Sequence, residues 1–169
     1  MRSPSLLLLV TIACGGGPTG PGKFTGTVAS IPLDLKDALF VGSKEVWLSS
    51  TEKLCDKLMH NQLPKGGTIA KFTLRPIEAG DFTVDPSTST TTNHTVFVQF
   101  FKLNDTCTNT VAFGPSLGTS GTVTVTDAKD KNGVTGSFDV TFGSTDKTTG
   151  NFASTWCDAP TTYPSPECT

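Results

Sequence analysis

The residues of this chain with the clearest chemistry are its five cysteines, Cys14, Cys55, Cys107, Cys157 and Cys168. Cysteine thiols pair as disulfides in oxidising compartments, and an even number of them is typical of an exported disulfide framework. Cys14 stands apart because it directly follows an apolar run near the start of the chain. Without it four cysteines remain, and we expect them to form two disulfides.

Four cysteines allow three pairings, and sequence alone does not choose between them. Cys157 and Cys168 are close in the sequence and flank a turn-rich stretch. We therefore expect a Cys157–Cys168 bond together with a Cys55–Cys107 bond. On the chain-entropy account, closing the longer loop contributes about 3–5 kcal/mol.

The first seventeen residues have the layout of a secretory leader. A basic residue, Arg2, precedes an apolar run over residues 6–10, and Ala13 and Cys14 are followed by three glycines. The run is far shorter than the roughly 20 residues that span a bilayer. A small residue directly before a cysteine resembles the lipobox of bacterial lipoproteins. That family usually has Leu, Val or Ile three residues before the cysteine, where this chain has Thr11.

The resemblance implies that Cys14 is lipidated on its sulfur and acylated on the new amino terminus, after residues 1–13 are removed. Several acyl chains on one residue anchor a protein stably to a membrane. Gly15 stands where an aspartate would favour the inner membrane in that family, which implies an outer-membrane location in a Gram-negative envelope. The alternative is an ordinary secretory signal, which would leave a free thiol near the mature terminus.

Composition indicates an exported β-rich protein. Only 17% of the residues are charged, and threonine, serine and glycine are abundant. Arg2 is the one basic residue before Cys14, so 12 of the 13 basic residues remain against 15 acidic ones, a net charge of −3. With no basic patch, nucleic acid is not expected as a partner. We divide the chain into a signal peptide (1–13), a Gly/Pro-rich tether (14–23), a β domain (24–158) and a Pro-rich tail (159–169).

Alternating apolar residues predict a succession of strands, and one segment has a helical period. Ser49 and Glu52 resemble a capping box before a helix over residues 50–62. The most apolar strand, over residues 95–103, is apolar on both faces and is expected to be covered on both sides. Asn132 and Gly133 predict a type I′ hairpin turn. The other expected strands span residues 23–35, 38–41, 45–48, 68–74, 81–84, 122–126, 134–142 and 151–156.

These elements predict a mainly β fold, either an antiparallel β-sandwich or a partly open barrel, with one short α-helix. The expected core consists of the inward positions of these strands and of the helix. It comprises Val28, Val46, Trp47, Leu54, Leu58, Phe72, Leu74, Phe82, Val98, Phe100, Val123, Val125, Phe138, Val140, Phe142 and Phe152.

Other candidates for chemistry are weak. His60 and His94 have no ligating residue at metal spacing, so we expect surface histidines and no metal or cofactor. The stretch over residues 127–133 matches a calcium loop only in its last four residues, and a hairpin turn explains every residue of it, so calcium is not expected there. Trp47, Trp156 and Tyr163 could stack on a ligand, although both tryptophans lie in expected strands.

Without a catalytic constellation, the sequence favours a lipid-anchored envelope lipoprotein whose β domain binds a partner or has a structural role. The lipid anchor would bind the protein to a membrane. The sequence does not define a protein or small-molecule partner. Two alternatives remain open. One is a secreted hydrolase whose site is assembled only by folding. The other is a barrel that carries an apolar ligand in an empty interior.

Overall fold

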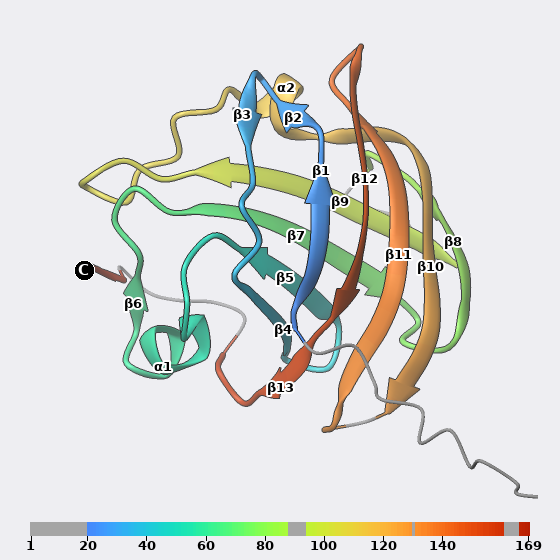
Figure 1. The fold of residues 1–169 in the computed structure, drawn as a ribbon, viewed down its shortest axis with the longest axis horizontal. Coiled ribbons are helices and arrows are strands. Elements are labelled where there is room, and N and C mark those ends of the chain that lie inside the picture. Colours follow the sequence, from blue (N-terminus) through green and yellow to red (C-terminus); the bar gives the residue numbers. More distant parts are fainter. Residues whose placement is uncertain (1–19, 88–93, 130, 161–165) are drawn as a thin grey trace, which may run out of the picture.

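The computed structural model describes residues 20–87, 94–129, 131–160 and 166–169, and it is dominated by one curled ten-stranded sheet (Figure 1). The expected mainly β fold, a β-sandwich or a partly open barrel, is confirmed. Neighbouring strands are mostly antiparallel, but β8 with β9 and β13 with β4 are parallel. In order across the sheet, the strands are β1 (Gly22–Thr25), β12 (Asp146–Ala153), β11 (Gly133–Phe142), β10 (Gly118–Lys129), β8 (Gly80–Val84), β9 (Thr95–Lys102), β7 (Thr68–Arg75), β5 (Glu45–Ser49), β4 (Asp37–Val41) and β13 (Thr155–Cys157).

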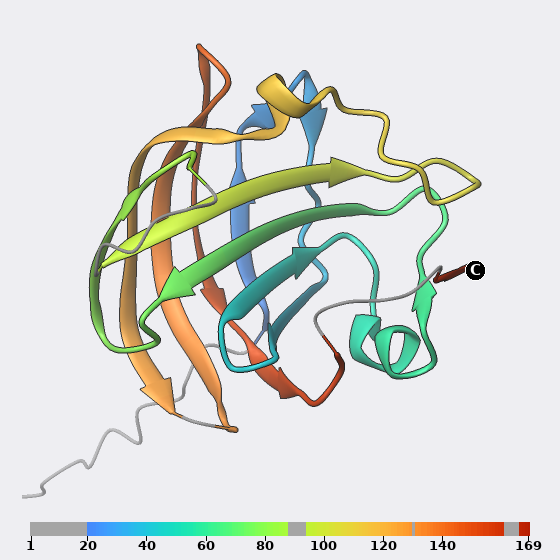
Figure 2. The same cartoon turned by 180° about the vertical axis from the view of Figure 1, so that it is seen from behind.

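Smaller elements lie around this sheet. Two short strand pairs lie beside it, β2 (Thr27–Val28) with β3 (Ile31–Pro32), and β6 (Gln62–Leu63) with β14 (Glu167–Cys168). Two short helices, α1 (Leu54–Met59) and α2 (Phe113–Ser116), lie outside the curl (Figures 1 and 2).

Phenylalanine rings fill the interior of the curl. The ring of Phe72 on β7 lies 5.3 Å from that of Phe138 on β11 and 6.1 Å from that of Phe152 on β12. Three strands separate β7 from β11 in the sheet, so these contacts cross the interior. Phe24 on β1 meets Phe100 on β9 at 6.5 Å in the same way. All sixteen residues expected in the core are at most 8% exposed, which confirms the predicted core.

Two glycines let these rings lie across neighbouring strands. Gly150 pairs with Phe138, and Gly136 pairs with Phe152. A Cβ at Gly150 would lie 2.6 Å from the Phe138 ring, and one at Gly136 would lie 2.7 Å from the Phe152 ring. Each aromatic ring therefore covers a bare backbone, a packing that stabilises glycine within strands.

A second apolar cluster, the outer core, lies on the opposite face of the sheet. It packs the outward residues of β4, β5 and β7 beneath α1, β6 and the segment after β13, and it confirms Trp47, Leu54 and Leu58 as core residues. The full set is Leu39, Val41, Trp47, Leu54, Leu58, Ile69, Leu103, Cys157 and Ala159.

The predicted helix over residues 50–62 is shorter in the structure, and its predicted cap is wrong. Ser49 remains in β5, where it pairs with Asp37 and Ile69, so the chain cannot turn into a helix there. The Leu54 N–H at the start of α1 instead donates to the Asp37 carboxylate at 2.8 Å. The cap is thus supplied by a strand seventeen residues earlier rather than by the adjacent residue.

The expectation that the strand over residues 95–103 is covered on both sides is also wrong. Val96, Val98 and Phe100 face the interior and are buried, but Phe97 and Phe101 on the outer face are only partly buried. The outer core is built over β4, β5 and part of β7, and it reaches β9 only at its end.

The predicted hairpin between β10 and β11 forms, but its turn is not a type I′ turn at Asn132 and Gly133. Asn132 N–H donates to the Lys129 carbonyl at 3.0 Å, and positive φ falls at Lys131 and Gly133 rather than at Asn132. Two consecutive positive-φ residues occur instead at Gly42 and Ser43 between β4 and β5, the tight turn expected there, and also at Ala29 and Ser30 between β2 and β3.

Replacing Gly150 with alanine tests the close packing around this glycine. The added methyl group would meet the Lys23 carbonyl oxygen of β1 as well as the Phe138 ring, so backbone or ring must shift. We expect the free energy of unfolding to fall by about 1–3 kcal/mol. Chemical denaturation measures this loss. Gly114→Ala is the matched control because a Cβ there meets no atom within 4 Å. Equal denaturation midpoints for the two variants would contradict the packing described.

Candidate functional site

The four described cysteines form two disulfides, Cys55–Cys157 and Cys107–Cys168. Two disulfides are confirmed, but the expected pairing, Cys157–Cys168 with Cys55–Cys107, is wrong. β13 runs parallel to β4 and brings Cys157 to α1, whereas the tail continues to β6 before Cys168 is reached. Closeness in the sequence was therefore a poor guide to closeness in the fold.

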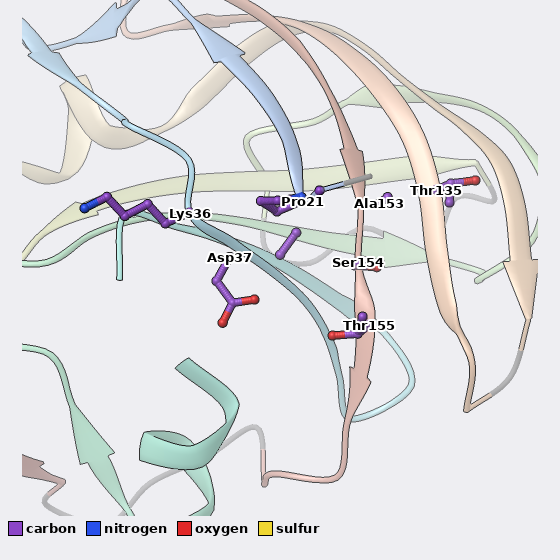
Figure 3. Close-up of a pocket in the computed structure, with 9 residues that line it drawn as sticks. Pro21, Lys36, Asp37, Thr135, Ala153, Ser154 and Thr155 are labelled. Carbon is purple, nitrogen blue, oxygen red and sulfur yellow. The ribbon is translucent and has the colours of Figure 1, made fainter. Parts of the chain in front are cut away.

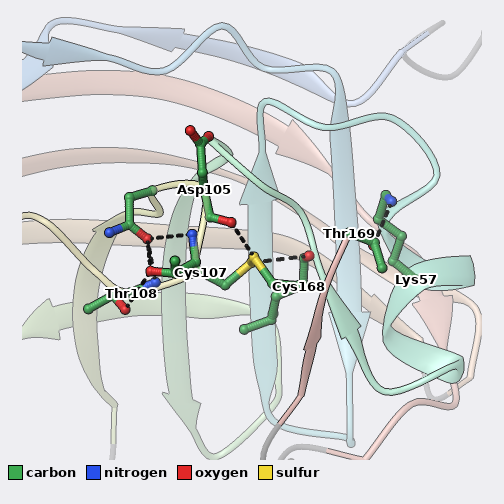
Figure 4. Close-up of a disulfide and its surroundings, with 9 residues drawn as sticks. Lys57, Asp105, Cys107, Thr108, Cys168 and Thr169 are labelled. Atoms are coloured by element: carbon green, nitrogen blue, oxygen red, sulfur yellow. Dashed lines mark hydrogen bonds between the residues drawn. A yellow bond between two sulfur atoms is a disulfide. The ribbon is translucent and has the colours of Figure 1, made fainter.

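The two disulfides have different surroundings. Cys55–Cys157 lies in the outer core, and Cys157 is 1% exposed. Cys107–Cys168 is more exposed and ties the tail to the loop after β9 (Figure 4). There the Cys168 Sγ lies 3.2 Å from the Asp105 carbonyl oxygen, and Lys57 Nζ donates to Thr169 Oγ1 at 3.1 Å. Each bond thus fastens part of the outer layer to the sheet.

A pocket of about 410 Å³, the seam pocket, opens where the two ends of the sheet approach each other (Figure 3). It lies between the start of β1, the start of β4 and the junction of β12 with β13. Its lining consists of Gly20, Pro21, Lys36, Asp37, Ala38, Thr135, Ala153, Ser154 and Thr155.

Asp37 is the half-buried carboxylate of the seam pocket. Burial raises the pKa of this carboxyl, and the hydrogen bonds from the Leu54 and Ala38 backbone N–H groups act in the opposite direction. Its side chain extends towards α1, away from Thr135 (Figure 3). Ser154 is also engaged, because its hydroxyl donates to the Val134 carbonyl at 2.7 Å. These polar groups hold the fold together rather than converge on a ligand.

The ionisable groups that line the seam pocket are few. Among the described residues that line it, Asp37 is the one acid and Lys36 the one base, with no histidine or cysteine. General acid–base and nucleophilic catalysis need a second group within hydrogen-bond reach of the first. The Asp37 carboxylate instead accepts hydrogen bonds from backbone N–H groups, that of Leu54 at 2.8 Å among them.

Both histidines are exposed, and neither is among the residues that line the seam pocket. His60 follows α1, with Nδ1 2.7 Å from the Asp56 carbonyl oxygen, and His94 Nε2 lies 3.0 Å from a Glu78 carboxylate oxygen. In the part of the chain that the structure describes, no cluster of three or more His, Cys, Asp or Glu side chains could hold a metal ion.

The remaining candidates from the sequence have structural roles or lie elsewhere. In the calcium-like stretch, the Asp127 carboxylate pairs with Lys129 at 2.8 Å. Trp156 is half-buried and packs edge-on against Phe40 at 5.3 Å. Tyr163 lies outside the described residues.

A smaller pocket of about 140 Å³, the outer-face pocket, lies at the open edge of the outer core. It is lined by Trp47, Leu63, Ile69, Lys71, Phe101 and Leu103. Beside it, the Trp47 indole N–H donates to one Glu45 carboxylate oxygen at 2.9 Å, and Lys71 Nζ lies 3.5 Å from the other. Sequence reasoning missed Glu45 and Lys71. The sequence did contain a signal for them. Each is a charged residue on the outward face of an expected strand, and Lys71 pairs with Trp47 across the two strands.

No protein-family model, curated protein or solved structure matches this chain. Neither helix among the described residues is long and apolar enough to cross a membrane.

Removing either disulfide is expected to destabilise the domain, and the buried bond should matter more. The loops closed, of 102 and 61 residues, predict losses of about 4–5 kcal/mol each on the chain-entropy account. Cys55→Ser/Cys157→Ser also places a hydroxyl in the outer core, which adds to the loss. Chemical denaturation of the two double variants shows which disulfide contributes more to the free energy of unfolding. A larger loss for Cys107→Ser/Cys168→Ser would contradict it.

Asp37→Asn tests the buried carboxyl. A raised folded-state pKa favours the protonated form, so the contribution of Asp37 to stability is greatest at low pH. That contribution is lost as pH rises from its ordinary value of 3.8 through the raised one. Asparagine does not titrate and can still accept from Leu54. The free energy of unfolding of the variant, relative to that of the wild type, should therefore increase between about pH 3 and pH 7. Chemical denaturation at several pH values measures this difference. A constant difference would contradict this.

Proposed function

We propose that this protein is a lipid-anchored envelope lipoprotein, acylated at Cys14, whose β domain binds rather than catalyses. One observation carries the proposal: the four described cysteines pair with one another. The domain therefore needs no bond to Cys14, which leaves that thiol for acylation. Disulfides are also typical of exported proteins.

The distance between anchor and domain is short. β1 begins at Gly22, where its pairing with Phe152 starts. Seven residues, 15–21, lie between the proposed acylated cysteine and the sheet, and the eight steps from Cys14 to Gly22 span at most about 30 Å even when fully extended. The domain would therefore act close to the membrane surface.

A binding role fits the domain better than the two alternatives. A hydrolase would need a second reactive group within hydrogen-bond reach of Asp37, but Asp37 accepts from the Leu54 backbone N–H, and the Ser154 hydroxyl donates to the Val134 carbonyl. A barrel carrier would need an open interior, whereas the rings of Phe24, Phe72 and Phe138 contact one another there. Hollows that could hold a ligand lie instead outside this interior, at the seam and on the outer face among other places.

Intact mass spectrometry of the membrane fraction tests the anchor. The wild-type protein should be heavier than the unmodified polypeptide over residues 14–169 by one diacylglyceryl and one acyl group. Cys14→Ala should lack this added mass and leave the membrane fraction. Thr11→Leu is the matched control, because it brings the leader closer to the lipoprotein pattern and should keep the modification. A soluble wild-type protein with a bare terminus would refute the proposal.

A further inference from the structure

The outer-face pocket has the size and lining of a site for one aromatic ring. Five of its six described lining residues are apolar, and its volume is about 140 Å³. In another protein, a cavity of about 150 Å³ lined by Leu, Ile and Phe takes up benzene. A single ring, rather than a long chain or a fused ring system, therefore matches the space.

The charged group that lines the pocket is the ammonium of Lys71. Lys71 is the one charged side chain among the described residues that line it, and its Nζ lies 5.9 Å from the Trp47 ring centroid. Glu45, which partners Lys71, is more deeply buried, since the two side chains are 8% and 22% exposed. An ammonium group has three donors, and the single contact with Glu45 at 3.5 Å occupies one of them. An acceptor at the mouth can use another.

The walls of the pocket are held in place before any ligand arrives. The Trp47 indole is fixed by its hydrogen bond to Glu45, whose other oxygen accepts from the Thr73 hydroxyl at 3.5 Å. Leu63 belongs to β6, which pairs with β14 next to the Cys107–Cys168 disulfide. Such preorganisation lowers the entropic cost of binding.

We propose that the outer-face pocket binds a compact aromatic carboxylate. The ring occupies the apolar space against Ile69, Phe101 and Leu103, and the carboxylate accepts a hydrogen bond from Lys71. This assignment rests on the proposed binding role of the domain and names the ligand class. It does not depend on the lipid anchor, so the mass measurement and the binding measurement can fail separately.

Titration of the full chain carrying Cys14→Ala and Trp156→Phe tests the assignment. The first change prevents acyl chains from competing for the pocket, and the second leaves Trp47 as the fluorescent reporter. The probes are phenylacetate, phenethyl alcohol and phenethylammonium, which share a ring and differ in charge. We expect saturable binding in that order of affinity, with the alcohol about threefold to tenfold weaker than phenylacetate.

Variants of Lys71 separate the charge from the pocket shape. Lys71→Met/Glu45→Gln removes both charges without leaving a buried carboxylate unpaired, and it should abolish the preference for phenylacetate while ring binding remains. Lys71→Arg should retain the preference. Lys23→Met, at an exposed lysine of β1 that lines neither the seam pocket nor the outer-face pocket, is the matched control and should change nothing.

Three results would overturn the assignment. They are the absence of a saturable fluorescence change with phenylacetate, equal or tighter binding of the alcohol or the ammonium compound, and a preference for phenylacetate that survives in the Lys71→Met/Glu45→Gln variant. If the double variant fails to fold, Lys71→Arg and the order of the three probes on the parent protein still decide.

Discussion

The contact between phenylalanine rings across the interior is the interaction on which the rest of the structure depends. Phe72 on β7 meets Phe138 and Phe152 on strands far from it in the sheet, so the sheet can bury its apolar face only by curling. That curl brings the two sheet ends together and sets β13 beside β4. The seam pocket and the Cys55–Cys157 bond both lie at this junction.

The curled sheet has a second apolar surface, and the disulfides secure the layer that covers it. α1 and β6 are too short to be stable alone, and they depend on the outer core and on crosslinks. Two acidic side chains on this face of the sheet also stabilise the covering layer. Asp37 accepts from the N–H at the start of α1, and Glu45 accepts from the Trp47 indole. Where the covering layer ends, at Phe101 and Leu103, the sheet face is left as a small apolar pocket.

Strands with a strong alternating pattern could be predicted from local sequence. The segment over residues 134–142 alternates apolar and polar residues throughout, and it forms most of β11. The first half of β12 was missed, because residues 146–150 contain no large apolar side chain. That half is a strand because it pairs with β11 on one side and β1 on the other. Pairing between distant segments thus overrode a weak local signal.

The sequence by itself determined the class of fold, sixteen of the buried residues and the likeness of the leader to a lipobox. These follow from periodicity and short motifs, which act over a few neighbouring residues. Only the tertiary structure decided the disulfide pairing, the capping of α1 by Asp37 and the meeting of Trp47 with Lys71. Each joins groups from different elements, up to 102 residues apart, and no local pattern encodes how a sheet curls.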